Sequence, residues 1–317
     1  MNRFPRLAAI VPDDAGWGFF LCTFKEVRTG RNGGEFLFLA LQDSSGQVPA
    51  KLFTDPDRFR TEVDAGDFIR AEGKATLYNG HVQLVLSTLR RVNPDQDAPH
   101  GFREEDCVLS APRPADEMWA ELMGHLGSVR DPHLRVLLNR IVLDNEAQLR
   151  VWPAAMQVHH AYRGGMLEHI TKMAEVGRFL ARMYDADEDL VLAGVVLHDI
   201  GKLQELAYEG GATSYTRDGN LVGHIALGLM LVREGASGIQ DFPLERRAQV
   251  EHLIASHHGS REHGSPVEPK TIEAFIVAAV DELDATLNQV RRAVNEDVGE
   301  EEFTAWQKRL GRVLYKG

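Results

Sequence analysis

Histidine and aspartate side chains interrupt apolar stretches at several places in the second half of the chain. The clearest case is GVVLHDIGKL, residues 194–203, where His198 and Asp199 follow an unbroken apolar run. The other positions of this kind are His169, His224, His257, His258 and Asp281. One buried histidine is usually a core residue with a satisfied hydrogen bond. This many, spread over the helices that the sequence predicts, indicate a shared site.

The chemistry of these side chains favours metal binding. An ionised carboxylate buried without a partner costs several kcal/mol, and no Lys or Arg lies in the apolar stretch FIVAAV that precedes Asp281. Imidazole and carboxylate ligands together suit Mn, Fe, Co, Ni or Zn and disfavour Ca and Mg. Because thiolates are absent from the set, a structural zinc site is disfavoured. We therefore expect a catalytic site with one or two divalent transition metals.

The ordered pattern H…HD…H…HH…D, with HD inside LHDIGK, resembles the HD-domain metal-dependent phosphohydrolases, which are all-helical proteins. The similarity continues through GGMLEHI, GNLVGHI, SHHG and VDELDA, and a barrel-like pattern precedes them. Nearly the whole chain is thus similar to the YhaM-type 3′-to-5′ exoribonucleases, in which an OB barrel precedes an HD domain. The resemblance implies an enzyme that trims single-stranded RNA, and also DNA, with manganese or a similar ion.

The resemblance also implies roles for individual residues. The first metal would be held by His169, His198, Asp199 and Asp281, and Asp199 would bridge to a second metal held by His224 and His257. His258 would be either a further ligand or a support. Two metals about 3.5–4 Å apart would supply a metal-activated hydroxide for phosphodiester hydrolysis. Lys202, one helical turn after His198, would contact a phosphate oxygen or else cap the helix end in solvent.

Three neighbours of these residues are less clear from the sequence. Asp284 falls one helical turn after Asp281, so it either orients a ligand or faces solvent. His159 and His160 precede the first assigned ligand and could support a ligand or contact the substrate, but we expect them in a surface loop.

The first third of the chain reads as short strands separated by turns. Alternating apolar residues predict strands at 17–27, 35–43, 47–53, 67–78 and 81–92, and Asn79 with Gly80 indicates a hairpin between the last two. Five such strands with a short insertion after the third suit a small closed barrel of the OB type. The fold class predicted for the chain is therefore a five-stranded OB-like barrel followed by an all-α HD domain.

Two phenylalanines need an explanation beyond the barrel core. Leu37, Leu39 and Leu41 share one face of the second strand, so Phe36 and Phe38 point to the other. Loops or the neighbouring domain could cover these rings. Alternatively they form a stacking platform for single-stranded bases, with Lys51, Lys74, Arg28 or Arg31 near the phosphate backbone.

The predicted domains are a barrel at 1–93, a linker at 94–115 and a helical domain at 116–317. The linker prediction rests on a polar, proline-rich composition without a period. Helical periodicity then predicts segments at about 116–127, 132–150, 165–184, 188–203, 221–234, 244–257 and 270–294.

Composition narrows the class of protein. The chain has 317 residues, 44% of them hydrophobic, and a formal net charge of -12. This charge argues against a general nucleic-acid coat protein, because phosphate binding depends on Lys and Arg. Residues 1–95 hold twelve basic and twelve acidic side chains, so the excess of acid lies in the remainder. Two cysteines cannot form a disulfide framework, and without a signal or membrane-spanning segment we expect a cytoplasmic protein.

Three functions remain open on this evidence. The first is an exonuclease that feeds a free 3′ end of single-stranded RNA or DNA into the helical site. The second is an HD-type phosphodiesterase or nucleotidase for a small nucleotide or cyclic nucleotide, although no GYP triplet follows the HD pair. The third is a nucleic-acid-binding protein with a regulatory or inactive HD site. Whether the chain forms a homo-oligomer is left open.

Overall fold

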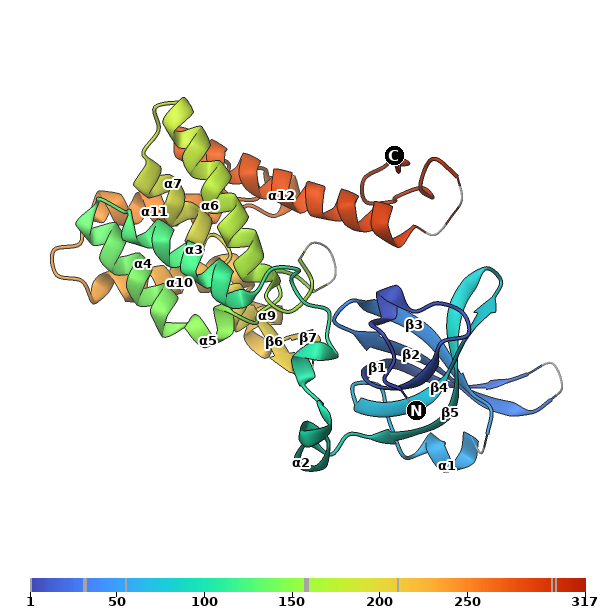
Figure 1. The fold of residues 1–317 in the computed structure, drawn as a ribbon. Coiled ribbons are helices and arrows are strands. Elements are labelled where there is room, and N and C mark those ends of the chain that lie inside the picture. Colours follow the sequence, from blue (N-terminus) through green and yellow to red (C-terminus); the bar gives the residue numbers. More distant parts are fainter. Residues whose placement is uncertain are drawn as a thin grey trace. The chain divides into compact units, whose positions relative to one another are not determined.

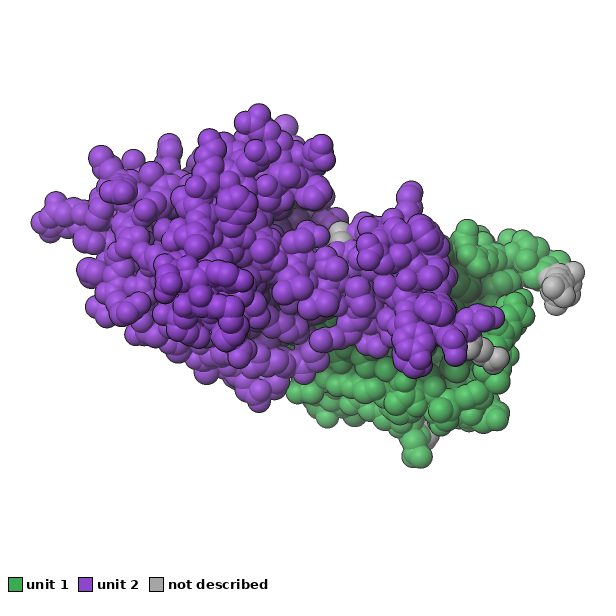
Figure 2. Space-filling model, turned by 90° about the horizontal axis from the view of Figure 1, so that it is seen from above, with its two compact units in different colours: residues 1–110, 208–212 green, residues 111–207, 213–317 purple. Residues whose placement is uncertain are grey.

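The computed structural model describes residues 2–30, 33–54, 56–156, 160–209, 211–297, 299 and 301–317. By its internal contacts the chain divides into two compact units, one of residues 1–110 with 208–212 and one of residues 111–207 with 213–317 (Figure 2). Within the described ranges, none of the helices combines the length and the apolar character that a membrane crossing requires.

The first unit is a closed barrel of five strands in the order β1-β2-β3-β5-β4 (Figure 1). The strands are β1 (Ala15–Thr29), β2 (Glu35–Asp43), β3 (Gly46–Leu52), β4 (Phe68–Tyr78) and β5 (His81–Arg91), and α1 (Pro56–Arg60) follows β3. The β3–β5 pair is parallel and all other neighbours are antiparallel. This confirms the predicted OB-like barrel.

The alternation of side chains explains why these strands close. Leu37, Leu39 and Leu41 have no exposed surface and fill the barrel, whereas Phe36 and Phe38 alternate with them and point to the outer face. At the turn from β4 to β5, Asn79 and Gly80 have φ angles of 50° and 81°. This left-handed pair suits a tight hairpin whose twist matches that of the strands.

The stretch predicted as a linker is packed on the barrel over most of its length. It contains α2 (Pro94–Asp97) and short 3₁₀ turns, and Phe102, Cys107 and Val108 are buried in a cluster with Phe19 and Leu21 of β1. The contact division accordingly falls after residue 110. The boundaries at 93 and 116 stay predictions.

The second unit is helical. Its helices are α3 (Ala115–Gly127), α4 (Pro132–Asp144), α5 (Glu146–Leu149), α6 (Gly165–Met183), α7 (Glu188–Leu197), α8 (Lys202–Glu205), α9 (Arg217–Leu221), α10 (His224–Ser237), α11 (Leu244–Ser256) and α12 (Ile272–Glu296). Two predicted helices are each broken in two, giving α4 with α5 and α7 with α8. The two-stranded sheet of β6 (Leu206–Glu209) and β7 (Ala212–Tyr215) was not predicted.

Helix α7 is the central element of this unit. It packs against α4, α6, α11 and α12, and every residue from Asp189 to Leu197 is buried. An apolar residue is therefore required at nearly every position, which explains the uniform run before His198. Asp187 caps the N-terminus of the helix, because its side chain accepts hydrogen bonds from the backbone N–H groups of Asp189 and Leu190. Its rigid packing fixes the chain that leaves its C-terminus.

Candidate metal centre

The predicted ligands come from five separate parts of the helical unit, and several stand at helix ends. His169 lies on α6 and Asp281 on α12, while His224 is the first residue of α10. His198 follows the last residue of α7 and His257 follows the last residue of α11. The sequence pattern predicted His198 inside a helix at 188–203 and His257 as the last residue of a helix at 244–257, but each helix ends just before its histidine.

This position at a helix end orients both rings. The last carbonyls of a helix have no partner within it, and His198 Nδ1 lies 2.8 Å from Val195 O while His257 Nδ1 lies 2.7 Å from Ile254 O. Because a carbonyl only accepts, each Nδ1–H donates and each Nε2 is left as an acceptor. The helix end thus selects the tautomer that can bind a metal through Nε2.

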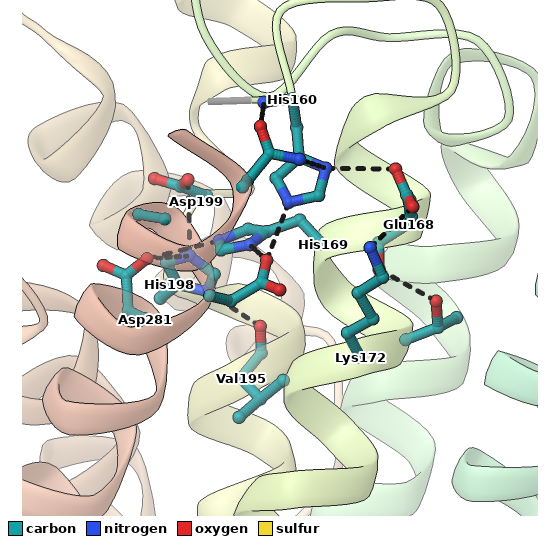
Figure 3. A network of polar contacts seen from close by, with 12 residues as sticks. His160, Glu168, His169, Lys172, Val195, His198, Asp199 and Asp281 are labelled. Atoms are coloured by element: carbon teal, nitrogen blue, oxygen red, sulfur yellow. Dashed lines mark hydrogen bonds and ion pairs between the residues drawn. The ribbon is translucent and has the colours of Figure 1, made fainter. Parts of the chain in front are cut away.

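A first cluster forms where α6, α7 and α12 meet (Figure 3). It consists of His169, His198 and Asp281, whose ligand atoms all lie within 4.8 Å of one another. Asp281 Oδ1 is 3.2 Å from His169 Nε2 and 4.0 Å from His198 Nε2. A second cluster consists of His224, His257 and His258, whose ligand atoms meet the same limit.

Asp199 lies between the two clusters with one oxygen toward each. Its Oδ2 is 3.3 Å from His198 Nε2, and its Oδ1 is 3.5 Å from His224 Nε2 and 3.6 Å from His257 Nε2. The structure therefore brings together all seven side chains that the sequence assigned to the metals, and the single residue expected to bridge them stands in the middle.

The buried polar atoms of this region fit bound metal ions. In the part of the chain that the structure describes, the Nε2 atoms of His198, His224 and His257 and the Oδ1 of Asp199 are buried without a hydrogen-bond partner. Each such atom costs about 1–3 kcal/mol of desolvation. Because they converge on common spaces and are borderline nitrogen and oxygen donors, one or two divalent transition metals would satisfy them together.

Both carboxylates and one histidine of the site are held in the charge state that binds a cation. Burial alone would raise the pKa of Asp199, but Lys202 and His198 hold it well below its ordinary value. Burial opposes ionisation of Asp281 in the same way, and His169 and His198 outweigh it. Burial, reinforced by His198, lowers the pKa of His257 to about 3, so this ring is neutral at pH 7. The centre therefore offers two carboxylates and a neutral imidazole at neutral pH.

Lys202 is buried beside this centre. Its ammonium lies 2.5 Å from Asp199 Oδ2, and only 9% of the residue is exposed. Burial lowers the pKa of Lys202, but Asp199 more than compensates and raises it above the ordinary value. The solvent-exposed cap that the sequence left open is thereby excluded, and the cation lies at the edge of the candidate site.

A polar network lies behind His169, and the sequence analysis anticipated it only at Asp284. Asp284 Oδ2 is 2.7 Å from His169 Nδ1 and 2.8 Å from His160 Nε2, so Asp284 orients a ligand rather than facing solvent. His160 Nδ1 lies 3.1 Å from Glu168 Oε2 (Figure 3). Tyr162 Oη also donates to that Glu168 oxygen, at 2.5 Å.

The prediction for His160 is therefore wrong. The residue is 1% exposed, and its ring nitrogens contact Glu168 of α6 and Asp284 of α12. His159 lies outside the described residues. A carboxylate that accepts a hydrogen bond from the second ring nitrogen of a ligand histidine fixes the tautomer of that histidine. The only sign of such a carboxylate in the sequence was the position of Asp284, one helical turn after Asp281.

In the second cluster, Glu205 orients His224 as Asp284 orients His169. Its Oε1 lies 3.1 Å from His224 Nδ1 and accepts the backbone N–H of His224 at 3.0 Å. His224 Nε2 is thus turned toward Asp199. No spacing in the sequence pointed to Glu205, because β6, β7 and α9 separate it from its partner.

The barrel residues assigned to nucleic acid lie on its outer face. Phe38 stands opposite Lys51 in the β2–β3 pair, and the guanidinium of Arg28 covers the Phe38 ring at 3.9 Å. Phe36 lies 5.1 Å from the ring of Phe53, which is 54% exposed. These rings form a half-exposed aromatic surface with cations at its edge.

The two lysines differ in their surroundings. Lys51 Nζ lies 3.9 Å above the ring of Tyr78, and Lys74 pairs with the exposed Asp13 at 2.7 Å. Both can therefore reach solvent and a polyanion. Arg31 lies outside the described residues.

Comparisons with known proteins agree with both halves of this description. The family model of the HD domain matches residues 166–286, and that of an OB-fold nucleic acid binding domain matches residues 23–92. The chain is 34% identical over 274 residues to a Bacillus subtilis protein named 3′-5′ exoribonuclease YhaM, covering 86% of this chain and 85% of that one. Proteins of the same name from Bacillus velezensis and Bacillus licheniformis are each 32% identical, with 90% and 86% of this chain and 89% and 85% of theirs covered.

Proposed function

Since the chain belongs to the family of YhaM 3′-5′ exoribonucleases, we propose that its helical unit hydrolyses the phosphodiester bonds of single-stranded RNA from the 3′ end with bound divalent metals. The observation that carries this proposal is Asp199, whose two oxygens face the two histidine clusters, where the Nε2 atoms of His198, His224 and His257 are buried without a hydrogen-bond partner among the described residues.

The reaction requires charge compensation at the phosphate. Metals held by the two clusters would polarise the phosphoryl oxygens and lower the pKa of a bound water. Other side chains of the site have supporting roles. Asp284 and Glu205 accept hydrogen bonds that hold His169 and His224 in their metal-binding tautomers. Lys202 places a buried cation beside Asp199. Hydrolysis breaks the bond between phosphorus and the 3′ oxygen of the penultimate nucleotide and releases a nucleoside 5′-monophosphate.

The barrel would hold the strand ahead of the site. Phe36 and Phe38 on its outer face offer rings for base stacking, and Arg28, Lys51 and Lys74 offer charge for the phosphates. Stacking on aromatic rings tolerates any base sequence. A barrel of this kind is not needed for a small substrate, so the small-nucleotide alternative is not favoured.

The proposal also covers the metal ion, the kind of nucleic acid, the end at which it enters and the cellular location. Manganese is the ion we propose, with Co, Fe, Ni and Zn as the alternatives that suit imidazole and carboxylate ligands. RNA is the proposed substrate ahead of DNA, a free 3′ end the proposed entry point and the cytoplasm the proposed location. His258 is proposed as a ligand of the second metal because its ring nitrogens group with those of His224 and His257.

A gel-resolved time course tests the proposal. Single-stranded RNA labelled at its 5′ end is incubated with manganese and either the wild-type protein or Asp199→Ala, whose fold is checked by circular dichroism. We expect a descending ladder with the wild type only. An intact strand with both proteins would contradict the exonuclease, and a ladder of equal rate with Asp199→Ala would show that the site is wrong.

A further inference from the structure

A cavity of about 460 Å³ opens beside the second histidine cluster. Its wall includes Lys202, Glu205 and His224 from the metal centre, together with Tyr215 of β7 and Arg309 from the C-terminal segment. Cavities of about 300–1,000 Å³ hold small ligands. The cavity is thus large enough for one nucleotide.

The lining of this cavity combines two kinds of chemistry. From the metal centre, His224 Nε2 lies 3.5 Å from Asp199 Oδ1, and Lys202 contributes its ammonium. The same lining includes Tyr215, which is 50% exposed, and Arg309, which no hydrogen bond or ion pair engages in the described part of the chain. An exposed aromatic ring and an uncommitted guanidinium together suit a base and its acceptor atoms.

The fold of the C-terminal segment holds Arg309 in place. Gln307 N–H donates to Arg312 O at 2.9 Å, and Gly311 N–H donates to Gln307 O at 2.8 Å, so Arg309 lies in a closed turn. At the base of this segment Lys316 Nζ pairs with Asp297 at 3.0 Å. Arg309 lies beyond residues 166–286, which match the family model of the HD domain, so that match assigns Arg309 no role.

We propose that this cavity receives the 3′-terminal nucleotide and retains it as the nucleoside 5′-monophosphate, an inference that rests on the proposed exonuclease. The phosphate lies beside Lys202, the base stacks on Tyr215, and Arg309 donates hydrogen bonds to the acceptor atoms of the nucleotide. The cavity thereby makes the enzyme release one nucleotide at a time.

Calorimetric titration of the manganese-loaded protein with adenosine 5′-monophosphate and, separately, with inorganic phosphate tests this site. Arg309→Gln and Tyr215→Ala should each lower the affinity for the monophosphate about tenfold relative to that for phosphate, the effect expected from one lost stacking or charged contact. Lys308→Gln is the matched control, because it removes an exposed cation from the same turn and should leave the ratio unchanged.

Two results would overturn the inference. One is a wild-type protein that binds the monophosphate no more tightly than inorganic phosphate, and the other is an unchanged ratio in both cavity variants with unaltered melting temperatures. Neither depends on RNA turnover. A protein that binds the monophosphate through Arg309 but degrades no RNA would instead refute the exonuclease and keep the cavity.

Discussion

Metal binding should strengthen steeply with pH because of one histidine. In the metal-free protein His169 lies between two carboxylates, with Nε2 3.2 Å from Asp281 Oδ1 and Nδ1 2.7 Å from Asp284 Oδ2. Burial lowers its pKa, but Asp281 and Asp284 outweigh this effect and raise the value to about 9. At pH 7 the ring is therefore doubly protonated, and a proton occupies the nitrogen that the metal needs.

The sign and size of the effect follow from this proton. A metal can bind Nε2 only after the proton leaves, so raising the pH favours binding until the ring is neutral above a pH of about 9. With a single competing proton, the affinity of the first cluster should rise about tenfold from pH 7 to 8 and about 50-fold from pH 7 to 9. His257 adds no proton to this release, since it is already neutral.

Titration calorimetry with manganese measures this directly. Runs at pH 7 in buffers of different ionisation enthalpy give the number of protons released, which should be close to one for the ion held by the first cluster. The second cluster, through His257, supplies an internal control that should bind with little dependence on pH in this range. An affinity for both ions that stays constant from pH 7 to 9, without proton release, would refute the assignment of His169 as a protonated ligand.

Three further sets of substitutions test a support of the metal centre, the aromatic surface of the barrel and the packing of the chain that follows α7. Asp284→Asn removes the carboxylate that orients His169, so manganese affinity should fall about 10–100-fold; an unchanged calorimetric affinity would contradict that role. Phe36→Ala with Phe38→Ala should weaken binding of a labelled single strand by about 1–3 kcal/mol per stacked base lost. If fluorescence anisotropy gives the same affinity for this variant and the wild type, the two rings do not stack on bases. Gly201→Ala should lower the free energy of unfolding by about 3 kcal/mol, because the added Cβ would lie 2.0 Å from a backbone oxygen of α10; Gly124→Ala, whose Cβ meets nothing within 4 Å, should instead stabilise helix α3 by about 1 kcal/mol in the same denaturant titration.

Local patterns in the sequence were sufficient to predict much of the fold. Strict alternation in β2 and the Asn79-Gly80 turn predicted the barrel, because a strand buried on one face must alternate and a tight hairpin needs left-handed residues. The helices of the second unit followed from their apolar period, with errors at their ends. Those ends were missed because an apolar run in a helix buried on all sides, such as α7, gives no sign of where the hydrogen bonds stop.

The ligands themselves could also be identified from the sequence. Ionisable residues such as Asp199 inside an apolar run require a partner, and metals were the partners that histidine and aspartate together suggest. Among their supports, only Asp284 gave a signal in the sequence, through its position one helical turn after Asp281. His160, Glu205 and Arg309 look like ordinary polar residues of loops and turns in the sequence.

Only the tertiary structure decided what these supporting residues contact. Asp284 meets His160 across 124 positions of the chain, and Arg309 reaches a cavity lined by residues some hundred positions earlier. A local hydrophobic pattern indicates which face of a helix or strand is buried, because each buried position requires its own apolar side chain. Which distant groups share a hydrogen bond or a cavity depends on how the elements pack against one another, and that packing is fixed by the whole core at once.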